Sequence, residues 1–359
     1  MRVNEGAKSV KKVRVGIIGT GNISEAHVDG YKQLKDVEIA AACDIDREKL
    51  TRYANTHGIP NTFTDYNEML AMADLDAVSV CTWNCAHTPV AIAALRAGKH
   101  VLCEKPLAMT VAEAQGMERE ALKAGRVLSV GFVMRFERKA DALRDLIRAG
   151  RLGDIFFAKT LNQRRAGSPV GWFTNKAYAG GGPMIDLGVH IIDICRYLMG
   201  NPKPVAVSGA TFGGLGLRSN IKGIARYVTS GPSDVFDIED LAVAMIRFEN
   251  GSVLQVETSY SQHVGKEDYY NLSLYGTKGG CDYEPRLSVY SEMDDYLMDI
   301  TPQFSWSEYD AFRREIAHFV DCVRGEAQSI APASDGVEIM KILCGVYESA
   351  QLGHEITIR

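Results

Sequence analysis

The chain has 359 residues, of which 46% are apolar, and it carries a net charge of -5. This length exceeds what a single hydrophobic core usually supports, so about two domains are expected. The negative charge and the absence of a run of Lys and Arg argue against a nucleic-acid partner. No apolar run approaches the roughly 20 residues of a membrane helix, so no membrane association is expected.

The amino terminus and the cysteines predict a cytoplasmic protein. Residues 1–9 lack the apolar core of a signal peptide. The eight cysteines lie mostly in apolar runs, and no two of them form a Cys-x-x-Cys pair. This pattern is typical of buried thiols in a reducing compartment, so neither a disulfide nor a metal site is expected.

The first part of the chain alternates short apolar runs with helical segments. Residues 1–12 are polar and predict a loose arm. Thr110 and Glu113 form a capping box, and Gly125 ends the helix that they begin. The alternation predicts a doubly wound parallel sheet, an α/β Rossmann domain over residues 1–131. Its strands are expected at 13–18, 37–43, 77–82, 100–103 and 127–130.

A glycine-rich turn follows the first predicted strand. Residues 19–24 read Gly-Thr-Gly-Asn-Ile-Ser, a G-x-G-x-x-G motif with serine in its third position, and a helical segment follows to about Leu34. Asp44 ends the second strand about twenty residues further on, as the dinucleotide fingerprint requires. We predict that the turn and the helix amino terminus bind a pyrophosphate. The residues expected to contact it are Gly19, Gly21, Asn22 and Ile23.

Asp44 favours NAD over NADP. A carboxylate accepts hydrogen bonds from a ribose 2′-OH, whereas at about 4 Å from a 2′-phosphate it would cost about 4 kcal/mol at an effective dielectric of 20. Arg47 weakens this preference, because an arginine there could bind the phosphate. NAD is the predicted cofactor and NADP is the alternative.

Two further segments follow predicted strands at the edge where open α/β sheets bind ligands. The first contains Thr82, Asn84 and His87, and His87 is placed either to contact the cofactor or to cap the helix that follows. The second is the stretch 100–107, in which an apolar strand runs into Glu104, Lys105 and a proline. The proline restricts the backbone before it, which predicts a lysine held at a strand end.

These motifs together resemble the Gfo/Idh/MocA family, named after glucose-fructose oxidoreductase, inositol dehydrogenase and a rhizopine-catabolism protein. The resemblance spans nearly the whole chain and is most specific at 98–106, Gly-Lys-His-Val-Leu-Cys-Glu-Lys-Pro. It implies a Rossmann domain that holds NAD or NADP, and a typically cis bond before Pro106. It also implies that Lys105 reaches both the nicotinamide and the substrate hydroxyl. The family's loop usually reads Thr-Pro-Asn, and Trp83 replaces the proline here. The cofactor contacts expected in these segments are Thr82, Asn84, His87, Glu104 and Lys105.

The second part of the chain predicts an α+β domain over residues 132–359. Longer alternating runs such as 252–258 and 270–275 indicate a large, mostly antiparallel sheet covered on one face. Residues 213–236 are rich in Gly and Ser and predict a long loop, and 335–352 predict a closing core helix. In the family this open-faced sheet commonly pairs with that of another subunit, which implies a homodimer or homotetramer.

The segment 180–193 carries the predicted chemistry of this domain. Three glycines precede a helix that places Asp186 and His190 at i and i+4 on one face, and Asp193 could orient the imidazole. The residues alone favour a capped helix with a satisfied polar cluster, but the resemblance implies the family's catalytic pair. The side chains expected at the substrate are Lys105, Arg135, Arg165, Trp172, Tyr178, Asp186, His190 and His263.

The resemblance implies an NAD(P)-dependent dehydrogenase or reductase. It would transfer a hydride between nicotinamide C4 and a secondary alcohol or ketone of a sugar, inositol or related polyol. His190 is our predicted base because its ordinary pKa lies near neutrality. Lys105 would polarise the oxygen, although some relatives give the proton transfer to the lysine. The alternatives are an NAD-dependent glycosidase that acts by transient oxidation and a non-catalytic dinucleotide-binding regulator. Neither the sugar nor the reaction direction follows from the sequence.

Overall fold

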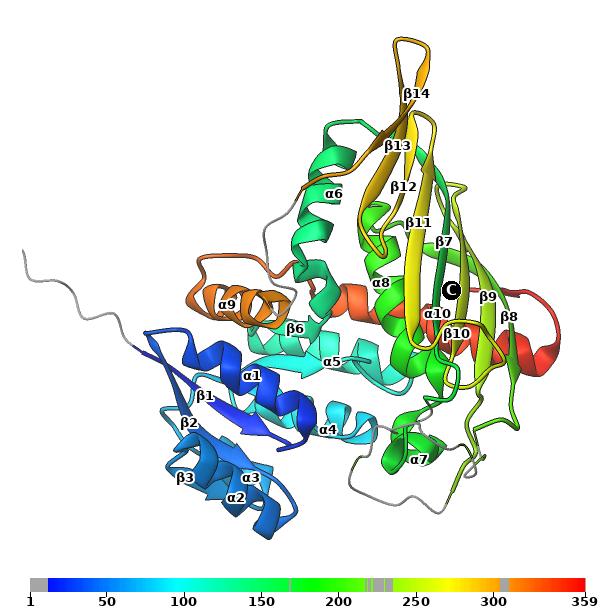
Figure 1. Cartoon of the computed structure of the whole chain (residues 1–359). Helices are drawn as coiled ribbons and strands as arrows, with labels where there is room; N and C mark the ends of the chain where they lie inside the picture. The colour runs from blue at the N-terminus through cyan, green and yellow to red at the C-terminus, as the bar shows by residue number, and fades with distance from the viewer. Residues whose placement is uncertain are drawn as a thin grey trace, which may run out of the picture.

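The fold is known from a computed structural model that describes residues 12–167, 169–216, 218, 221, 229, 235–303 and 310–358. It contains a 6-stranded sheet and a 9-stranded sheet (Figure 1). The arm predicted over 1–12 lies outside the described residues except for Lys12, as does much of the loop predicted over 213–236. Among the described residues, no helix combines the length and the apolar character needed to cross a membrane.

The 6-stranded sheet is parallel throughout and has the order β3-β2-β1-β4-β5-β6. Its strands are β1 (Val13–Ile18), β2 (Val37–Cys43), β3 (Asn61–Phe63), β4 (Ala77–Val80), β5 (His100–Glu104) and β6 (Leu128–Gly131). The order reverses between β1 and β4, which is the point where doubly wound sheets bind ligands. The predicted Rossmann fold is confirmed. The sequence reading missed β3, because three residues are too short to show a periodic pattern.

Helices connect these strands with the expected local signals. They are α1 (Asn22–Lys32), α2 (Arg47–His57), α3 (Tyr66–Leu70), α4 (Asn84–Arg96) and α5 (Val111–Ala124). Thr110 and Glu113 form the predicted capping box, and Gly125 ends α5 in the left-handed conformation. The strands are apolar because the sheet is covered on both faces, and Val15 and Ile17 are fully buried.

The 9-stranded sheet has the order β14-β13-β12-β11-β7-β10-β9-β8-β15, and only β7 and β10 among its neighbours pair in parallel within the described residues. This confirms the predicted mostly antiparallel sheet. Its strands are β7 (Ile155–Gln163), β8 (Pro204–Phe212), β9 (Leu241–Phe248), β10 (Val253–Ser259), β11 (Tyr269–Gly276), β12 (Gly279–Asp282), β13 (Ser288–Met293), β14 (Tyr296–Ile300) and β15 (Ile356–Thr357). The helical segments of this half are η1 (Val133–Phe136), α6 (Arg138–Arg148), η2 (Trp172–Thr174), α7 (Lys176–Ala179), η3 (Met184–Gly188), α8 (Val189–Leu198), α9 (Asp310–Arg324) and α10 (Ala333–Leu352).

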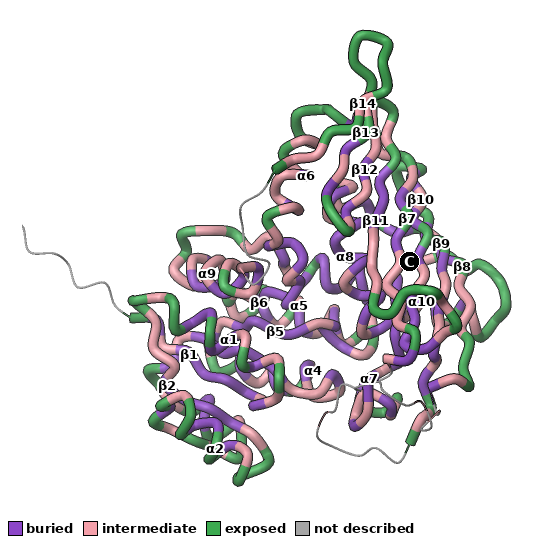
Figure 2. The backbone as a smooth tube through the Cα atoms, in the orientation of Figure 1, coloured by how far each residue is buried: buried purple, intermediate pink, exposed green. Residues whose placement is uncertain are grey.

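One face of this sheet is covered by helices and the other is open. Helix α8 packs on β7 and β11, and α10 packs on β8 (Figure 1). Along β9, buried residues alternate with partly buried and exposed ones (Figure 2). Apolar side chains remain on the open face, where Met245 and Tyr275 are each 42% exposed.

Helix α9 returns to the first domain late in the chain. It packs against α1, and its residues Ile316, Phe319 and Val320 share one buried cluster with Val15 and Ile17. The core of the first domain therefore also takes residues from near the end of the chain, beyond β6, which ends at Gly131.

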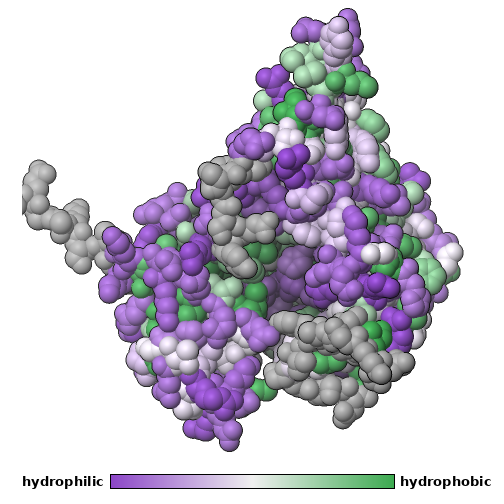
Figure 3. Space-filling model, in the orientation of Figure 1, coloured by the Kyte–Doolittle hydropathy of each residue, from purple (hydrophilic) through white to green (hydrophobic). Residues whose placement is uncertain are grey.

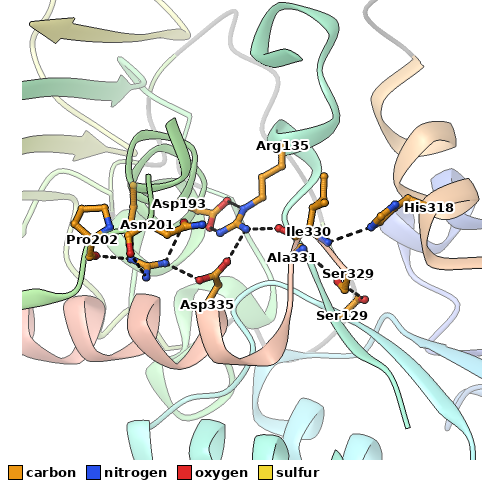
Figure 4. A network of polar contacts seen from close by, with 11 residues as sticks. Ser129, Arg135, Asp193, Asn201, Pro202, His318, Ser329, Ile330, Ala331 and Asp335 are labelled. Atoms are coloured by element: carbon orange, nitrogen blue, oxygen red, sulfur yellow. Dashed lines mark hydrogen bonds and ion pairs between the residues drawn. The ribbon is translucent and has the colours of Figure 1, made fainter. Parts of the chain in front are cut away.

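A buried ion-pair network joins the connection between the domains to α8 and α10 (Figure 4). Arg135 of η1 donates through Nε to Asp193 Oδ2 at 2.9 Å and through Nη1 to Asp335 Oδ2 at 2.7 Å. Arg196 donates to the other oxygen of Asp335 at 2.9 Å. Arg135 is fully buried and Asp193 is 1% exposed. Because isolated buried charges are very unfavourable, the three segments must keep this arrangement.

Replacing Arg135 with Ala should destabilise the protein strongly. The substitution leaves the carboxylates of Asp193 and Asp335 without their shared cation, so the free energy of unfolding should fall by about 3–5 kcal/mol. Urea unfolding followed by circular dichroism measures the change. Arg313→Ala is the control, because Arg313 pairs with Asp29 on the surface and its loss should have little effect. Equal effects of the two variants would contradict a structural role for the buried network.

Candidate active site

A cavity of about 1000 Å³ lies where the 6-stranded sheet faces the second domain. The space-filling view shows a hollow in the molecular surface between the two domains (Figure 3). Side chains from both domains line the cavity, including Lys105, Asp186 and His190. All the residues predicted to contact the cofactor also line it, namely Gly19, Gly21, Asn22, Ile23, Asp44, Thr82, Asn84, His87, Glu104 and Lys105.

The glycine turn leaves room for a pyrophosphate. Gly19 has φ +91°, and a Cβ atom there would lie 2.5 Å from the carbonyl oxygen of Cys81. A Cβ atom on Gly21 would meet nothing within 4 Å, and Gly21, the N-cap residue of α1, provides no side-chain cap among the residues that the structure describes. An uncapped helix amino terminus beside open space suits a phosphate, so the turn fits a dinucleotide.

Asp44 is held as an anion at the end of β2. Its Oδ2 accepts hydrogen bonds from the Thr20 backbone N and Oγ1, at 2.8 and 2.6 Å, and its Oδ1 accepts one from Asp46 N at 3.0 Å. Burial raises the pKa of Asp44, but these hydrogen bonds outweigh burial and lower it. Arg47 is exposed and does not line the cavity. The nearby cation is Lys49, whose Nζ lies 3.4 Å from Asp44 Oδ2.

His87 joins two loops of the nucleotide-binding half. Its Nδ1 lies 2.7 Å from the Pro106 carbonyl oxygen and its Nε2 lies 3.2 Å from that of Thr82. Burial lowers its pKa, so the ring is neutral and donates to one of the two carbonyls. Although His87 lies in α4 and lines the cavity, its ring holds the loop beside the cis Lys105-Pro106 bond and does not cap the helix.

The carboxylate of Glu104 contacts a buried histidine, His27, which the sequence did not predict. His27 Nε2 lies 2.9 Å from Glu104 Oε1, and the Lys105 backbone N donates to Glu104 Oε2 at 3.2 Å. Burial opposes a charged imidazole, but the neighbouring Cys81 and then Glu104 raise the pKa of His27 to about 10. The pair therefore holds the backbone of Lys105. A histidine on a helix gives no sequence signal of such a partner, because Glu104 is 77 residues away.

Lys105 and Asp186 form the central contact of the cavity. Lys105 Nζ donates to Asp186 Oδ1 at 2.7 Å and to its backbone oxygen at 3.1 Å. The hydroxyl of Tyr260 donates to Asp186 Oδ2 at 2.9 Å. Burial raises the pKa of Asp186, but the charge and the hydrogen bond of Lys105, together with the charge of Arg164, outweigh burial and lower the pKa. Asp186 is therefore an anion with both oxygens engaged. Tyr260 was not predicted, because it follows β10 without a motif.

The helical segment that carries Asp186 and His190 begins differently from the prediction. Asp186 lies in the π-helical segment η3 and His190 lies in α8, so the two residues do not share one regular α-helix. Glu239 accepts hydrogen bonds from the backbone N of Gly182 and Met184 and fixes this start. π-helical turns occur frequently at functional sites.

His190 lines the cavity as a neutral imidazole. Burial and the charge of Lys105 lower the pKa of His190 to about 3. The oxygens of Asp186 are taken by Lys105 and Tyr260, and Asp193 is paired with Arg135. The expectation that Asp193 orients the imidazole is therefore wrong.

Four other residues predicted at the substrate lie outside the cavity lining, namely Arg135, Arg165, Tyr178 and His263. Arg135 is fully buried in its ion pairs, and Arg165 and His263 are exposed. Of the aromatic residues, Trp172 lines the cavity and Tyr178 packs on Trp83.

Arg164 takes the position that we expected for Arg165. It lines the cavity, and its Nε lies 3.5 Å from Asp268 Oδ1. Adjacent side chains in an extended segment point to opposite sides, and the segment follows β7 directly. The sequence alone could not show which of the two arginines faces inward.

The cavity and its residues define a dinucleotide-dependent oxidoreductase. Residues 13–132 match the model of an oxidoreductase family with an NAD-binding Rossmann fold, and residues 144–358 match that family's C-terminal alpha/beta domain. The chain belongs to the Gfo/Idh/MocA oxidoreductase family, and NAD is its cofactor.

Several relatives cover most of the chain. D-glucoside 3-dehydrogenase of Escherichia coli is 32% identical over 98% of this chain and 99% of its own length. Myo-inositol 2-dehydrogenase of Thermotoga maritima is 27% identical over 74% of each chain. The structure of a levoglucosan dehydrogenase in complex with NADH has a TM-score of 0.85 and 25% identity, covering 97% of this chain and 100% of the other.

Replacing Arg164 with Gln should weaken substrate binding, because the side chain supplies charged donors to the cavity. The KM for a reactive polyol should rise about tenfold to a hundredfold. Steady-state kinetics with saturating NAD measure it. Arg165→Gln is the matched control and should leave KM unchanged. If Arg165→Gln raised KM and Arg164→Gln did not, the placement of the two side chains would be wrong.

Proposed function

We propose that the protein is an NAD-dependent dehydrogenase acting on a secondary alcohol of a sugar, cyclitol or related polyol. The observation that carries the proposal is the 2.7 Å contact between Lys105 Nζ and Asp186 Oδ1, beside a neutral His190, in the cavity that contains the dinucleotide turn. NAD, when bound, accepts the hydride. The relatives named above are dehydrogenases of a glucoside, an inositol and levoglucosan, which supports this substrate class.

Lys105 and Asp186 form the polar part of the substrate site. The ammonium of Lys105 donates a hydrogen bond to the reacting hydroxyl and stabilises the negative charge that develops on its oxygen. Asp186 keeps Lys105 oriented and can accept a hydrogen bond from a neighbouring hydroxyl of the substrate. Tyr260 holds the second oxygen of Asp186, so the carboxylate cannot rotate away from Lys105.

His190 receives the hydroxyl proton. Its pKa is low because the ring is buried beside a cation, so it is neutral and able to accept a proton. As negative charge grows on the substrate oxygen, the local potential becomes more favourable for an imidazolium, and the ring's proton affinity rises at that moment.

The assembly, location and boundary are part of the same proposal. The open sheet face carries Met245, Tyr275 and Phe212, which are 42%, 42% and 54% exposed, and it suits pairing with a second copy. All eight cysteines are unpaired, which supports a reducing compartment such as the cytoplasm. We place the boundary between the two domains after Gly131, where β6 ends.

Replacing Lys105 with Met should reduce the rate of hydride transfer about a hundredfold to a thousandfold, because the developing alkoxide loses its cation. Replacing His190 with Asn should reduce it about a hundredfold or more through loss of the base. Single-turnover NADH formation, with a reactive polyol found by a substrate panel, measures both rates. Near-normal rates in both variants would remove the assignment.

The pH profile provides a second readout for His190. Because its pKa lies near 3, the imidazole stays neutral as the pH falls from 8 to 5, so kcat/KM should show no acid limb from this group in that window. An inflection near the ordinary histidine pKa that disappears in His190→Asn would contradict a buried, neutral base.

The oligomer can be tested on the open face. Met245→Lys should lower the mass measured by light scattering from that of an oligomer toward 39.4 kDa, because it places a charge in the apolar contact. Leu122→Lys is the control, since Leu122 is 77% exposed on α5 and away from this sheet. A wild-type monomer, or an unchanged mass for Met245→Lys, would contradict pairing through this face.

A further inference from the structure

Two of the glycines that precede Asp186 are required by close contacts. A Cβ atom on Gly181 would lie 2.1 Å from the Tyr347 hydroxyl oxygen, and one on Gly182 would lie 2.4 Å from the Glu239 backbone oxygen. Neither glycine has a positive φ, so neither adopts the left-handed conformation that favours glycine. The two glycines are therefore needed for the space that Tyr347 and Glu239 occupy.

Glu239 and Tyr347 hold the backbone that leads into η3. The backbone N of Gly182 donates to Glu239 Oε2 at 2.9 Å, and the backbone N of Met184 donates to Glu239 Oε1 at 3.1 Å. The Tyr347 hydroxyl donates to Glu239 Oε1 at 2.7 Å. One carboxyl group thus joins α10, which carries Tyr347, to the start of η3.

The backbone of η3 presents Asp186 to Lys105. Asp186 lies two residues after Met184, and Lys105 Nζ donates both to its Oδ1 at 2.7 Å and to its backbone oxygen at 3.1 Å. Because the backbone oxygen takes part, moving the η3 backbone weakens the contact, and a rotation of the side chain cannot restore it. π-helical turns are rare, so one at this position requires contacts that hold it.

We propose that Glu239 and Tyr347 are positioning residues for the hydride transfer, because their hydrogen bonds hold η3 where Asp186 meets Lys105. Neither residue is among those that line the cavity, so both act through Asp186 and not by contact with the substrate. The inference rests on the proposed function and adds the residues behind its central contact. Helix α10 then supports the site twice, through Tyr347 to η3 and through Asp335 to the ion pairs that hold α8.

The second domain offers a matched pair of the same chemistry away from the cavity. The Tyr283 hydroxyl donates to Glu137 Oε2 at 2.8 Å. Tyr283 is fully buried, and neither Tyr283 nor Glu137 lines the cavity. Tyr283→Phe and Glu137→Gln are therefore the controls for Tyr347→Phe and Glu239→Gln, because they remove a Tyr–Glu hydrogen bond that does not support η3.

Single-turnover NADH formation with a reactive polyol measures the positioning role. Glu239→Gln should slow it about tenfold, because a backbone amide loses its acceptor, and Tyr347→Phe should slow it about threefold to tenfold. The Kd for NADH, measured by its fluorescence, should change less than about twofold, since the dinucleotide turn lies in the other domain. Both controls should keep the rate within about twofold of the wild type.

A double-mutant cycle shows whether Glu239 acts through Asp186. In an Asp186→Ala background, Glu239→Gln should slow the rate by less than about threefold, because residues that act through one contact are not additive. Acetylation of Lys105 by acetic anhydride gives a second readout that needs no substrate. Lys105 should be labelled about threefold faster in Glu239→Gln, with Lys123, whose side chain is 79% exposed, as the internal standard.

The proposal is overturned if Glu239→Gln and Tyr347→Phe keep the rate of the wild type, if the two controls slow it equally, or if the effects of Glu239→Gln and Asp186→Ala multiply. If the wild type reduces NAD with no polyol, the proposed function fails by itself. The labelling of Lys105 then decides the positioning role. Faster labelling in Glu239→Gln and Tyr347→Phe, but not in the controls, supports it, whereas unchanged labelling overturns it.

Discussion

The buried guanidinium of Arg135 is the constraint on which the geometry of the second domain depends. A charge this deep is tolerated only if its carboxylate partners stay in place, so α8 and α10 cannot shift independently. Asp193 lies one helical turn after His190 on α8. The network therefore positions α8, which carries the proposed base, although Arg135, Asp193 and Asp335 do not line the cavity. Arg135, in the segment that connects the two domains, therefore also fixes the position of His190, the proposed base.

The charged groups of the cavity are held by contacts that begin at this helix. Asp186 reaches Lys105 across the domain boundary, and Tyr260 completes its hydrogen bonds. On the other side, Glu104 and His27 form a buried pair beneath the Lys105 backbone. Lys105 is thus held at both ends, by its backbone amide and by its ammonium. An ion pair between the domains is preorganised only when both of its partners are held in this way.

The sequence predicted the features that depend on neighbouring residues. It did not predict the contacts between residues that are far apart in the chain. β1 and β2 have the predicted bounds because a buried parallel strand has a continuous apolar pattern. The dinucleotide turn and Lys105 were found because each directly follows a strand. Arg135 was misread because Asp335, its partner, is 200 residues away and gives no signal beside it. Tyr260 and His27 were missed for the same reason, since neither partner is a sequence neighbour.

The division of labour between Lys105 and His190 follows from which groups are already engaged. Lys105 Nζ is engaged by Asp186 through a short, charge-assisted hydrogen bond of 2.7 Å. His190 makes no hydrogen bond among the described residues, and its ring is neutral. Of these two groups, His190 is therefore the one that can accept the substrate proton without losing an existing interaction. This supports the proposed roles, in which His190 accepts the proton and Lys105 stabilises the oxygen that the proton leaves.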